Sequence, residues 1–499
     1  MQDRPNILVI MSDQHACRRI GCYGDPTART PNIDRLAAKG MRFDSAYCPA
    51  PVCVPSRMSF MTGRKPSDIN VIENFDILSS ITPTWAAHAG RAGYETALIG
   101  RMHFEGPDQY HGFDFVHPDF VNWKGTGPRQ QFIYTAKVPV DNYWSERNSI
   151  ENSGSGKTYV QFNDERVCSA SCDYLKEHSQ KTDKPFAAVV GFYMPHPPYV
   201  GRTDLFMKYF NTVQTDNSDE MAFPEYLRNY FKDFRSWWIP GSMDKNKIRM
   251  AMASYYAMIE QLDSLIGTIL DSLKKNNLAE NTVVIYVSDH GDMSSVKNSW
   301  GKLLFYEESV KVPLVIRYPG RINPGSVCSQ VCNLRDLSQT LCSIAGAEPL
   351  SAADARSLEP LFSGKSSAWE NYTESEICLF PIIRQKKHAA CKMVRYNEWK
   401  LWCYIIEGKA SYSLFNLKND PFELHDLIGN ASCTIILEKL KIHLHQNWDH
   451  DRILNEAIQR KKDRGMTAGN LESRGIPSFS FPANLDETIK KDHSHAESA

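Results

Sequence analysis

Hydrophobic runs that end in polar residues form the clearest pattern in this chain of 499 residues. Examples are "NILVIMSD", which begins at Asn6 and ends at Asp13, "YETALIGRMH", which ends at His103, "FAAVVGFYMPH", which ends at His196, and "NTVVIYVSDH", which ends at His290. Their apolar residues are consecutive and do not alternate with polar ones, which is typical of parallel strands covered on both faces. We therefore expect a sheet that is mostly parallel.

Helical patterns lie between these predicted strands. Thr30 and Pro31 open the stretch "PNIDRLAAKG" with an N-cap residue and a proline at the first helical position, and Gly40 is placed to end it. Residues 247–275 carry apolar positions at three- and four-residue spacing, just before the strand that leads to Asp289. This alternation predicts an α/β fold in which helices sandwich one large sheet.

The pattern changes after about residue 370. The stretch "ACKMVRYNEWKLWCYIIEGKASYSLFNLKNDP" alternates more in polarity and contains turn signals, so it predicts a small antiparallel sheet with the helix 436–448 packed on it. The polar end "KKDHSHAESA" is typical of disorder. We expect a large α/β domain at 1–370, an α+β subdomain at 371–450 and a partly disordered extension at 451–499. The segment between the predicted helix and the polar end is free to contact a second copy in a homo-oligomer.

Composition and charge exclude some classes of function. The chain has 57 basic and 58 acidic residues, and this balance gives no field that would gather nucleic acid or an anionic membrane. It has no run of about 18 apolar residues, so we expect no membrane span. No basic segment, apolar segment and cleavage site open the chain, which leaves a cytoplasmic protein or a secreted or periplasmic one with its signal trimmed. The 13 cysteines lack zinc-type CxxC pairs, and most are expected to be reduced core residues.

Chemically active side chains gather at the predicted strand ends. Asp13, Arg101, His196 and Asp289 each follow a different hydrophobic run. A single one of them would fit a turn or a helix cap. Ligands in open α/β sheets bind beyond the carboxyl ends of the strands, so residues from several ends that meet at this edge indicate an active site.

The stretch "CVPSR" adds a nucleophile and a cation. Pro55 and Ser56 predict the start of a helix, whose free N–H groups and positive dipole end would face an anion beside Cys53. Arg57 adds a planar cation that suits oxyanions. This pattern predicts a site for sulfate or phosphate.

Motifs from residues 4 to 430 resemble those of type I sulfatases of the alkaline-phosphatase superfamily. They are "PNILVIMSDQ", "TPNIDRLAAKG", "CVPSRMSFMTGRKP", "AGYETALIGRMHFEGPDQYHGFD", "SDHGD", "WGKLLFYEESVKVPLVIRYPG" and "LFNLKNDPFELHDL". The resemblance implies an alkaline-phosphatase-like fold, with the catalytic sulfatase domain at 1–370. Within the family, the sequence is similar to the choline-sulfatase-like and carbohydrate-sulfatase branches.

The resemblance also implies a modified residue and a metal. A separate maturation enzyme would oxidise Cys53 to formylglycine, whose hydrated form is the nucleophile. Asp13, Gln14, Asp289, His290 and position 53 would bind a divalent cation, with calcium expected. Gln14 and His290 replace a commonly acidic residue and a common asparagine, and an imidazole ligand also suits manganese or zinc.

By the same resemblance, further residues receive roles in the reaction. Arg57 would hold the diol, and His103 would take its proton when sulfate is expelled. Arg101 stands where a lysine is usual, so a point-like ammonium is replaced by a wider fork. Lys302 would bridge the sulfate and the leaving oxygen, and His196 would protonate that oxygen.

Hydrolysis of a carbohydrate or other alkyl sulfate monoester is therefore the leading interpretation, with a small-molecule or oligosaccharide sulfate ester as substrate. A phosphonate monoester or phosphodiester hydrolase of the same superfamily is the alternative, and a non-catalytic sulfated-glycan-binding protein is a third. Substrate choice is assigned to the aromatic-rich segments 118–180 and 200–245. Trp237 and Trp238 there either stack on a sugar or quaternary ammonium or anchor the segment.

Overall fold

The molecule is described here from a computed structural model. The described residues are 4–117, 146–181, 184–213, 224–231, 244–351, 354–364, 367–380 and 387–473. The predicted substrate residues Trp237 and Trp238, and the aromatic segment 120–134, lie outside these ranges.

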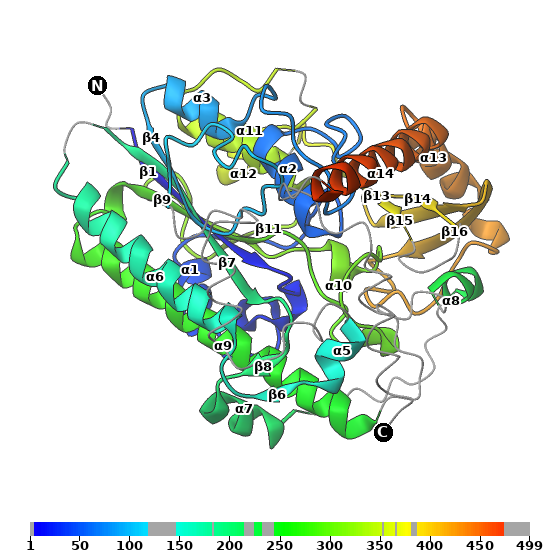
Figure 1. The fold of residues 1–499 in the computed structure, drawn as a ribbon, viewed down its shortest axis with the longest axis horizontal. Helices are drawn as coiled ribbons and strands as arrows, with labels where there is room; N and C mark the ends of the chain where they lie inside the picture. The colour runs from blue at the N-terminus through cyan, green and yellow to red at the C-terminus, as the bar shows by residue number, and fades with distance from the viewer. Residues whose placement is uncertain are drawn as a thin grey trace.

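A large sheet lies at the centre of the molecule (Figure 1). Its eight strands follow the order β11-β2-β10-β9-β1-β7-β4-β5. The strands are β1 (Asn6–Asp13), β2 (Met41–Phe43), β4 (Glu95–Gly100), β5 (Phe115–Val116), β7 (Phe186–Pro195), β9 (Thr282–Ser288), β10 (Leu314–Arg317) and β11 (Ser326–Cys328). The four hydrophobic runs quoted above thus become the adjacent strands β9, β1, β7 and β4.

The sheet is mostly parallel, as predicted. β1 pairs in parallel with β7 and β9, and β4 pairs in parallel with β7 and β5. Among the described strands of this sheet, β10 is antiparallel to both of its neighbours. The register between β1 and β9 places Ser12 opposite Ser288, so Asp13 and Asp289 leave the sheet side by side.

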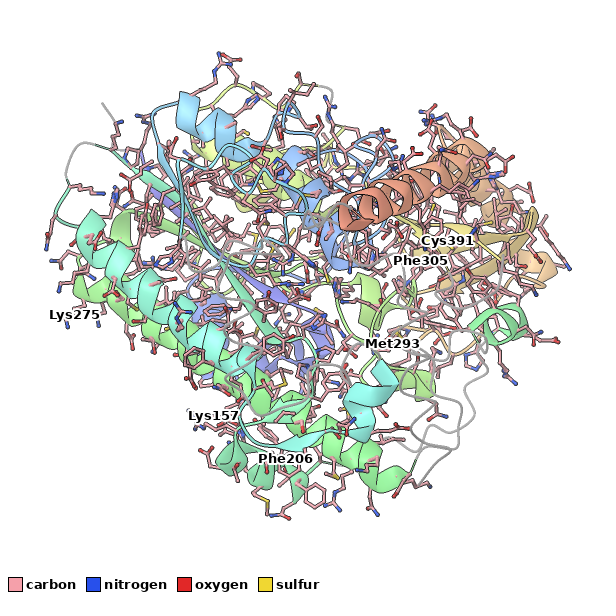
Figure 2. All side chains as sticks on the ribbon, viewed as in Figure 1. Lys157, Phe206, Lys275, Met293, Phe305 and Cys391 are labelled. Atoms are coloured by element: carbon pink, nitrogen blue, oxygen red, sulfur yellow. The ribbon has the colours of Figure 1, made fainter. Side chains whose placement is uncertain are left out.

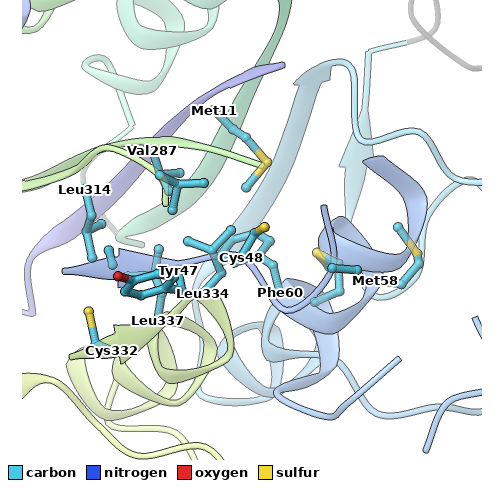
Figure 3. Close-up of a cluster of buried hydrophobic side chains, with 14 of the residues drawn as sticks. Met11, Tyr47, Cys48, Met58, Phe60, Val287, Leu314, Cys332, Leu334 and Leu337 are labelled. Carbon is cyan, nitrogen blue, oxygen red and sulfur yellow. The ribbon is translucent and has the colours of Figure 1, made fainter. Parts of the chain in front are cut away.

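Helices cover both faces of the sheet (Figure 1). One face packs against α1 (Pro31–Ala38), α6 (Tyr159–His178) and α9 (Lys245–Lys275), and the other against α2 (Cys53–Thr62), α3 (Trp85–Arg91) and α11 (Leu334–Ile344). Along β1, Val9 and Met11 lie in one apolar cluster, and Leu8 and Ile10 lie in the other. Figure 3 shows Met11 in the cluster that contains Phe60 of α2. Because both faces are buried, the strand sequence does not alternate in polarity.

The first helix begins at the predicted proline, but the residues on either side of the helix make contacts that the sequence did not predict. Pro31 is the first residue of α1, and Thr30 occupies the N-cap position. The Thr30 hydroxyl donates to Asp34 Oδ1 at 3.1 Å, and Asp263 of α9 accepts the N–H groups of the first turn. Gly40 follows the helix because a Cβ there would lie 2.3 Å from a carbonyl oxygen of β10.

A second, antiparallel sheet lies beside the large one, as predicted. Its strands, in order, are β13 (Tyr372–Leu379), β14 (Ala389–Tyr396), β15 (Trp399–Ile406) and β16 (Lys409–Asn416). The predicted helix forms α13 (Thr434–His445), which packs on this sheet with α14 (His450–Ser473). Phe305 and Cys391 belong to the buried cluster that joins the two parts of the molecule (Figure 2).

Shorter helices and strands lie between these elements. They are α5 (Glu146–Glu151), α7 (Thr203–Phe210), α8 (Glu225–Phe231), α10 (Glu307–Val310), α12 (Glu359–Phe362), and the strand pairs β3 (Ala46–Tyr47) with β12 (Cys332–Asn333) and β6 (Gly154–Ser155) with β8 (Val200–Gly201). Within the described ranges, none of the helices has the length and apolar character that crossing a membrane would require.

Candidate active site

The carboxyl ends of β1 and β9 bring two carboxylates together. Asp13 is the last residue of β1, and Asp289 follows β9; both are fully buried. The backbone N–H of Gln14 donates to Asp289 Oδ1 at 3.1 Å. Gln14 has a φ of 65°, a left-handed conformation that an ordinary residue keeps only where its surroundings hold it. The two strand ends are thus joined directly at the site.

Helix α2 places Cys53 beside these carboxylates. The helix begins at Cys53, two residues before the predicted start, and the thiol is buried. Its Sγ lies 3.6 Å from Asp13 Oδ1 and 3.2 Å from His290 Nε2. The ammonium group of Lys302 donates to Sγ at 3.0 Å. Position 53 therefore lies between an anionic pair and a cation.

One helical turn after Cys53, Arg57 links the two carboxylates. Its Nε donates to Asp289 Oδ2 at 2.7 Å, and an Nη donates to Asp13 Oδ2 at 3.1 Å. The other Nη donates to the carbonyl of Arg101 at 2.8 Å. Because Arg57 is fully buried, this pairing is required to offset the cost of removing its charge from water. Arg57 fixes the geometry of the strand ends.

Arg101 connects Asp13 to His103. Its Nε donates to Asp13 Oδ2 at 2.7 Å, and an Nη donates to His103 Nδ1 at 2.6 Å. The guanidinium lies over the ring of Tyr193, 4.2 Å from its centroid. At Gly191, a Cβ would lie 1.9 Å from the Arg101 carbonyl oxygen, so the strands approach closely here. The guanidinium of Arg101 is thus fixed by hydrogen bonds to Asp13 and His103 and by the ring of Tyr193 against its face.

His103 is oriented by its neighbours. A guanidinium only donates hydrogen bonds, so the bond from Arg101 to Nδ1 assigns the proton of the neutral ring to Nε2. Nε2 lies 3.6 Å from Glu105 Oε1. Burial and the adjacent Arg101 lower the pKa of His103 to about 3. The residue has a φ of 61°, a second left-handed position in this site.

His196 and Lys302 complete the set around position 53. His196 follows β7, and its Nδ1 lies 2.8 Å from the carbonyl oxygen of Pro197. Lys302 is buried, and its Nζ lies 3.5 Å from His290 Nε2. His103 and His196 both lie near enough to Cys53 to help lower the pKa of its thiol. The structure therefore brings together every residue that the sequence assigned to the site.

The electrostatics favour an anion at position 53. All cysteines are free thiols, and burial raises the pKa of a typical one, Cys17, to about 12. At Cys53, burial is outweighed by Lys302 and His290, which hold its pKa well below the ordinary value. The pKa of Asp13 is also lowered, because Arg101, His196 and Arg57 together outweigh burial and the neighbouring thiolate.

Four side chains could hold a metal ion. Ligand atoms of Asp13, Cys53, Asp289 and His290 lie within 4.8 Å of one another. His290 Nδ1 lies 2.9 Å from the Gly291 carbonyl and donates to it, so when the ring is neutral the lone pair of Nε2 faces the cluster. Two carboxylates offset the charge of a dication, and the donors suit a hard cation that also accepts an imidazole.

Asp292 orients the amide of Gln14, a contact that the sequence did not assign. Gln14 Nε2 donates to Asp292 Oδ2 at 2.5 Å, so the oxygen of this amide is the atom that can face a cation. Asp292 also accepts from the Tyr199 hydroxyl at 2.8 Å and from the Ser294 N–H at 2.6 Å. Asp292 lies in the quoted motif "SDHGD", three residues after Asp289, and this spacing was the available signal.

Comparison with known families gives two matches. The model described as "Sulfatase" matches residues 5–347. The model described as "N-sulphoglucosamine sulphohydrolase, C-terminal" matches residues 297–450. The first match contains every site residue named above, and the second contains the antiparallel sheet.

Individual proteins agree with these matches. A choline-sulfatase of Rhizobium meliloti is 30% identical over 453 residues, which cover 86% of this chain and 83% of that protein. An N-acetylglucosamine-6-O-sulfatase of Bacteroides thetaiotaomicron is 25% identical, over 92% of this chain and 90% of its own. The crystal structure of a phosphonate monoester hydrolase of Agrobacterium radiobacter has a TM-score of 0.72 at 22% identity and covers 88% of this chain and 95% of that one. At this identity, the last match shows the fold alone.

Proposed function

The chain belongs to the sulfatase family and is a sulfuric ester hydrolase, and from this premise we propose that it hydrolyses a carbohydrate or other alkyl sulfate monoester through a formylglycine made from Cys53. The products are the alcohol and inorganic sulfate. The observation that carries the proposal is the position of Cys53 Sγ, 3.0 Å from Lys302 Nζ and 3.2 Å from His290 Nε2. Sγ stands in for an oxygen of the modified residue.

The modified residue supplies the nucleophile. A maturation enzyme replaces the thiol by an aldehyde, which hydrates to two geminal hydroxyl groups. One hydroxyl attacks sulfur, and the S–O bond to the alcohol oxygen breaks. The second hydroxyl then loses its proton, and sulfate leaves as the C–O bond breaks and the aldehyde reforms. Water does not have to attack a hindered sulfate anion.

A divalent cation, with calcium proposed, would be held by Asp13, Gln14, Asp289, His290 and position 53. It supplies positive charge that lowers the pKa of the diol and offsets the charge of the sulfate oxygens. Arg57 fixes the positions of the two carboxylates relative to each other, because it donates a hydrogen bond to each.

His103 receives the proton of the second hydroxyl in this scheme. Acceptance at Nε2 requires the tautomer with the proton on Nδ1, in which Arg101 no longer donates to that atom. Sulfate oxygens compete for the same Arg101 N–H group, so a bound substrate favours the required tautomer. Arg101 therefore couples sulfate binding to the readiness of His103.

His196 and Lys302 act on the departing oxygen. Lys302 contacts Cys53 Sγ at 3.0 Å, and His196 lies near enough to help lower the pKa of this thiol. His196 donates a proton to the alkoxide, and Lys302 stabilises the negative charge shared by this oxygen and the sulfate. General acid catalysis of this kind contributes about 10²–10⁴-fold.

A second function is favoured by one observation, the fold shared with a phosphonate monoester hydrolase. Turnover of 4-nitrophenyl sulfate should be compared with that of a matched nitrophenyl phosphonate and a phosphodiester, on protein made beside an active maturation enzyme. We expect the highest kcat/KM for the sulfate. A higher kcat/KM for the phosphonate or diester would replace the proposal by the second function, and binding of sulfated glycans without turnover of any ester would indicate a non-catalytic protein.

The substrate class is tested by a panel. The similar proteins named choline-sulfatase and N-acetylglucosamine-6-O-sulfatase motivate choline sulfate and sulfated amino sugars as the first candidates. We expect one of these alkyl sulfates to exceed the aryl sulfate in kcat/KM. Equal, slow turnover of all members would show that the natural ester lies outside both classes.

A further inference from the structure

Asn74 caps the helix that begins at Cys53. The Oδ1 atom of Asn74 accepts the N–H of Val54, the second residue of α2, at 2.9 Å. The N–H groups in the first turn of a helix have no partner within the helix, and Val52 at the N-cap position has no side-chain acceptor to offer. A side chain 20 positions later in the sequence therefore satisfies a backbone group adjacent to the nucleophile.

Asp76 holds the loop that carries Asn74. Residues 72–76, here called the capping loop, turn around the Asp76 carboxylate, which is 2% exposed. Its Oδ2 accepts the N–H groups of Ile72 at 2.9 Å and Glu73 at 3.1 Å. Its Oδ1 accepts from Arg464 at 2.6 Å. One buried carboxylate thus joins the loop backbone to a distant arginine.

Helix α14 supplies that arginine and packs on the same loop. Arg464 also donates to the carbonyl of Phe75 at 2.9 Å and pairs with the Glu73 carboxylate. Ile72 is buried in one apolar cluster with Ile453 and Ala457 of α14. In Figure 1, α14 (red) runs over β13 and β14 toward α2. The contacts make α14 part of the support for the capping loop.

We propose that Arg464 of α14 is a positioning residue for the active site, acting through Asp76 and Asn74 to hold the first turn of α2 and with it residue 53. Without Arg464, the buried Asp76 keeps only its longer contact with Arg460, at 3.4 Å, and the partly buried Glu73 loses its ion pair, so the loop rearranges. Asn74 then no longer stays beside the Val54 N–H. The antiparallel subdomain is thereby connected to residue 53 through the contacts of Arg464, Asp76 and Asn74.

The test uses hydrogen exchange of the peptide that contains Val54, because this readout needs no enzymatic activity. Asn74→Leu removes the acceptor, and we expect exchange about five- to tenfold faster, which corresponds to one lost cap. Arg464→Met should give a similar increase. Asn74→Asp keeps an acceptor and should exchange at nearly the wild-type rate. Arg452→Met is the matched control, because Arg452 is exposed on the same helix and pairs with Glu456.

The double variant distinguishes a linked chain from two separate effects. Since Arg464 acts through Asn74, Asn74→Leu with Arg464→Met should exchange within about twofold of Asn74→Leu alone. An increase equal to the product of the single effects, or unchanged exchange in folded Arg464→Met, overturns the proposal. If Arg464→Met does not fold, Arg464→Lys keeps the charge but loses the fork and should give an intermediate rate.

Turnover of 4-nitrophenyl sulfate provides the second arm, which rests on the proposed function. We expect kcat to fall about fivefold or more in Arg464→Met and Asn74→Leu, with a smaller change in KM, and to stay unchanged in Arg452→Met. Exchange that responds while kcat does not would show a structural cap without a role in positioning. A wild-type enzyme without turnover would contradict the proposed function and leave the exchange result standing.

Discussion

The Nζ atom of Lys302 lies 3.0 Å from Sγ of Cys53, although 249 positions separate the two residues in sequence. A buried lysine next to a thiol costs free energy unless the sulfur carries negative charge or is replaced by a more polar group. His290 Nε2, at 3.2 Å from the same sulfur, adds to this demand. These contacts support the proposal that modification places an oxygen anion at position 53.

Modification of Cys53 is the first prediction. In protein made beside an active maturation enzyme, the peptide that contains Cys53 should show the mass change for loss of hydrogen sulfide and gain of one oxygen atom. Peptide mass spectrometry measures this change, and an aldehyde-reactive hydrazide should label the same peptide. Protein made without the maturation enzyme is the control. Full activity in protein that carries only the thiol would disprove the proposed nucleophile.

Metal dependence is the second prediction. Asp289→Asn should lose bound metal and at least about 10³-fold in kcat, because it removes one of two carboxylates that offset the cation's charge. Elemental analysis of the purified variant separates this cause from the lost pairing with Arg57. Asp271→Asn, at an exposed carboxylate, should keep both metal and activity. Chelation should abolish turnover, and calcium should restore it; full activity in metal-free protein would contradict the assignment.

The third prediction concerns stability against acid. Glu374 is buried, and Lys392, Arg335 and Lys65 outweigh that burial and hold its pKa well below the ordinary value of 4.5. A lowered pKa in the folded protein means that Glu374 stabilises the fold above about pH 4.5 and that this stability is lost as the pH falls further.

Thermal unfolding measures this effect. Glu374→Gln should lower Tm at pH 7, because Lys392, Arg335 and Lys65 lose the anion that they share, and should weaken the fall in Tm between about pH 5 and pH 3. Glu407→Gln, at an exposed turn between β15 and β16, should change neither. If the Glu374→Gln protein kept the wild-type dependence of Tm on pH, other carboxylates would control the acid transition.

The sequence predicted the sheet and the residues at its edge because both depend on local patterns. Unbroken apolar runs identified β1 and β9, and a residue that follows a buried parallel strand must leave the sheet at its carboxyl edge. The register that pairs Ser12 with Ser288 then brings Asp13 to Asp289. Cys53 and Arg57 are one helical turn apart, so their common direction was also predictable.

Contacts that depend on tertiary packing were not predictable. Tyr193 lies three residues before His196 in the same run, and nothing in the run indicates that its ring lies against Arg101. The pairing of Asp76 with Arg464 joins residues 388 positions apart, and neither lies in a quoted motif of the site. Such pairs are fixed by how β7, α2 and α14 pack, which a pattern along one element does not contain.

The tautomer of His103 gives the fourth prediction. If this residue accepts a proton at Nε2, glutamine cannot replace it. The amide nitrogen of glutamine donates hydrogen bonds but has no basic lone pair that could take a proton. His103→Gln should then be as slow as His103→Ala, and residue 53 should stay sulfated in both, as peptide mass spectrometry after substrate addition would show. His425→Ala, at an exposed histidine, is the control. If His103→Gln kept about a tenth or more of the wild-type kcat, the histidine would act as a hydrogen-bond donor.

Leaving-group dependence separates His196 from the residues that act at sulfur. A nitrophenolate departs readily without a proton, whereas a sugar or choline alkoxide needs one as its charge develops. His196→Ala should therefore lower kcat for an alkyl sulfate about 10²-fold or more and for 4-nitrophenyl sulfate by less than about tenfold, provided that chemistry limits both rates. Lys302→Ala should lower both, because its ammonium contacts position 53 directly. Equal losses for the two esters in His196→Ala would assign this histidine to sulfate binding, and the proton donor would then have to come from another side chain.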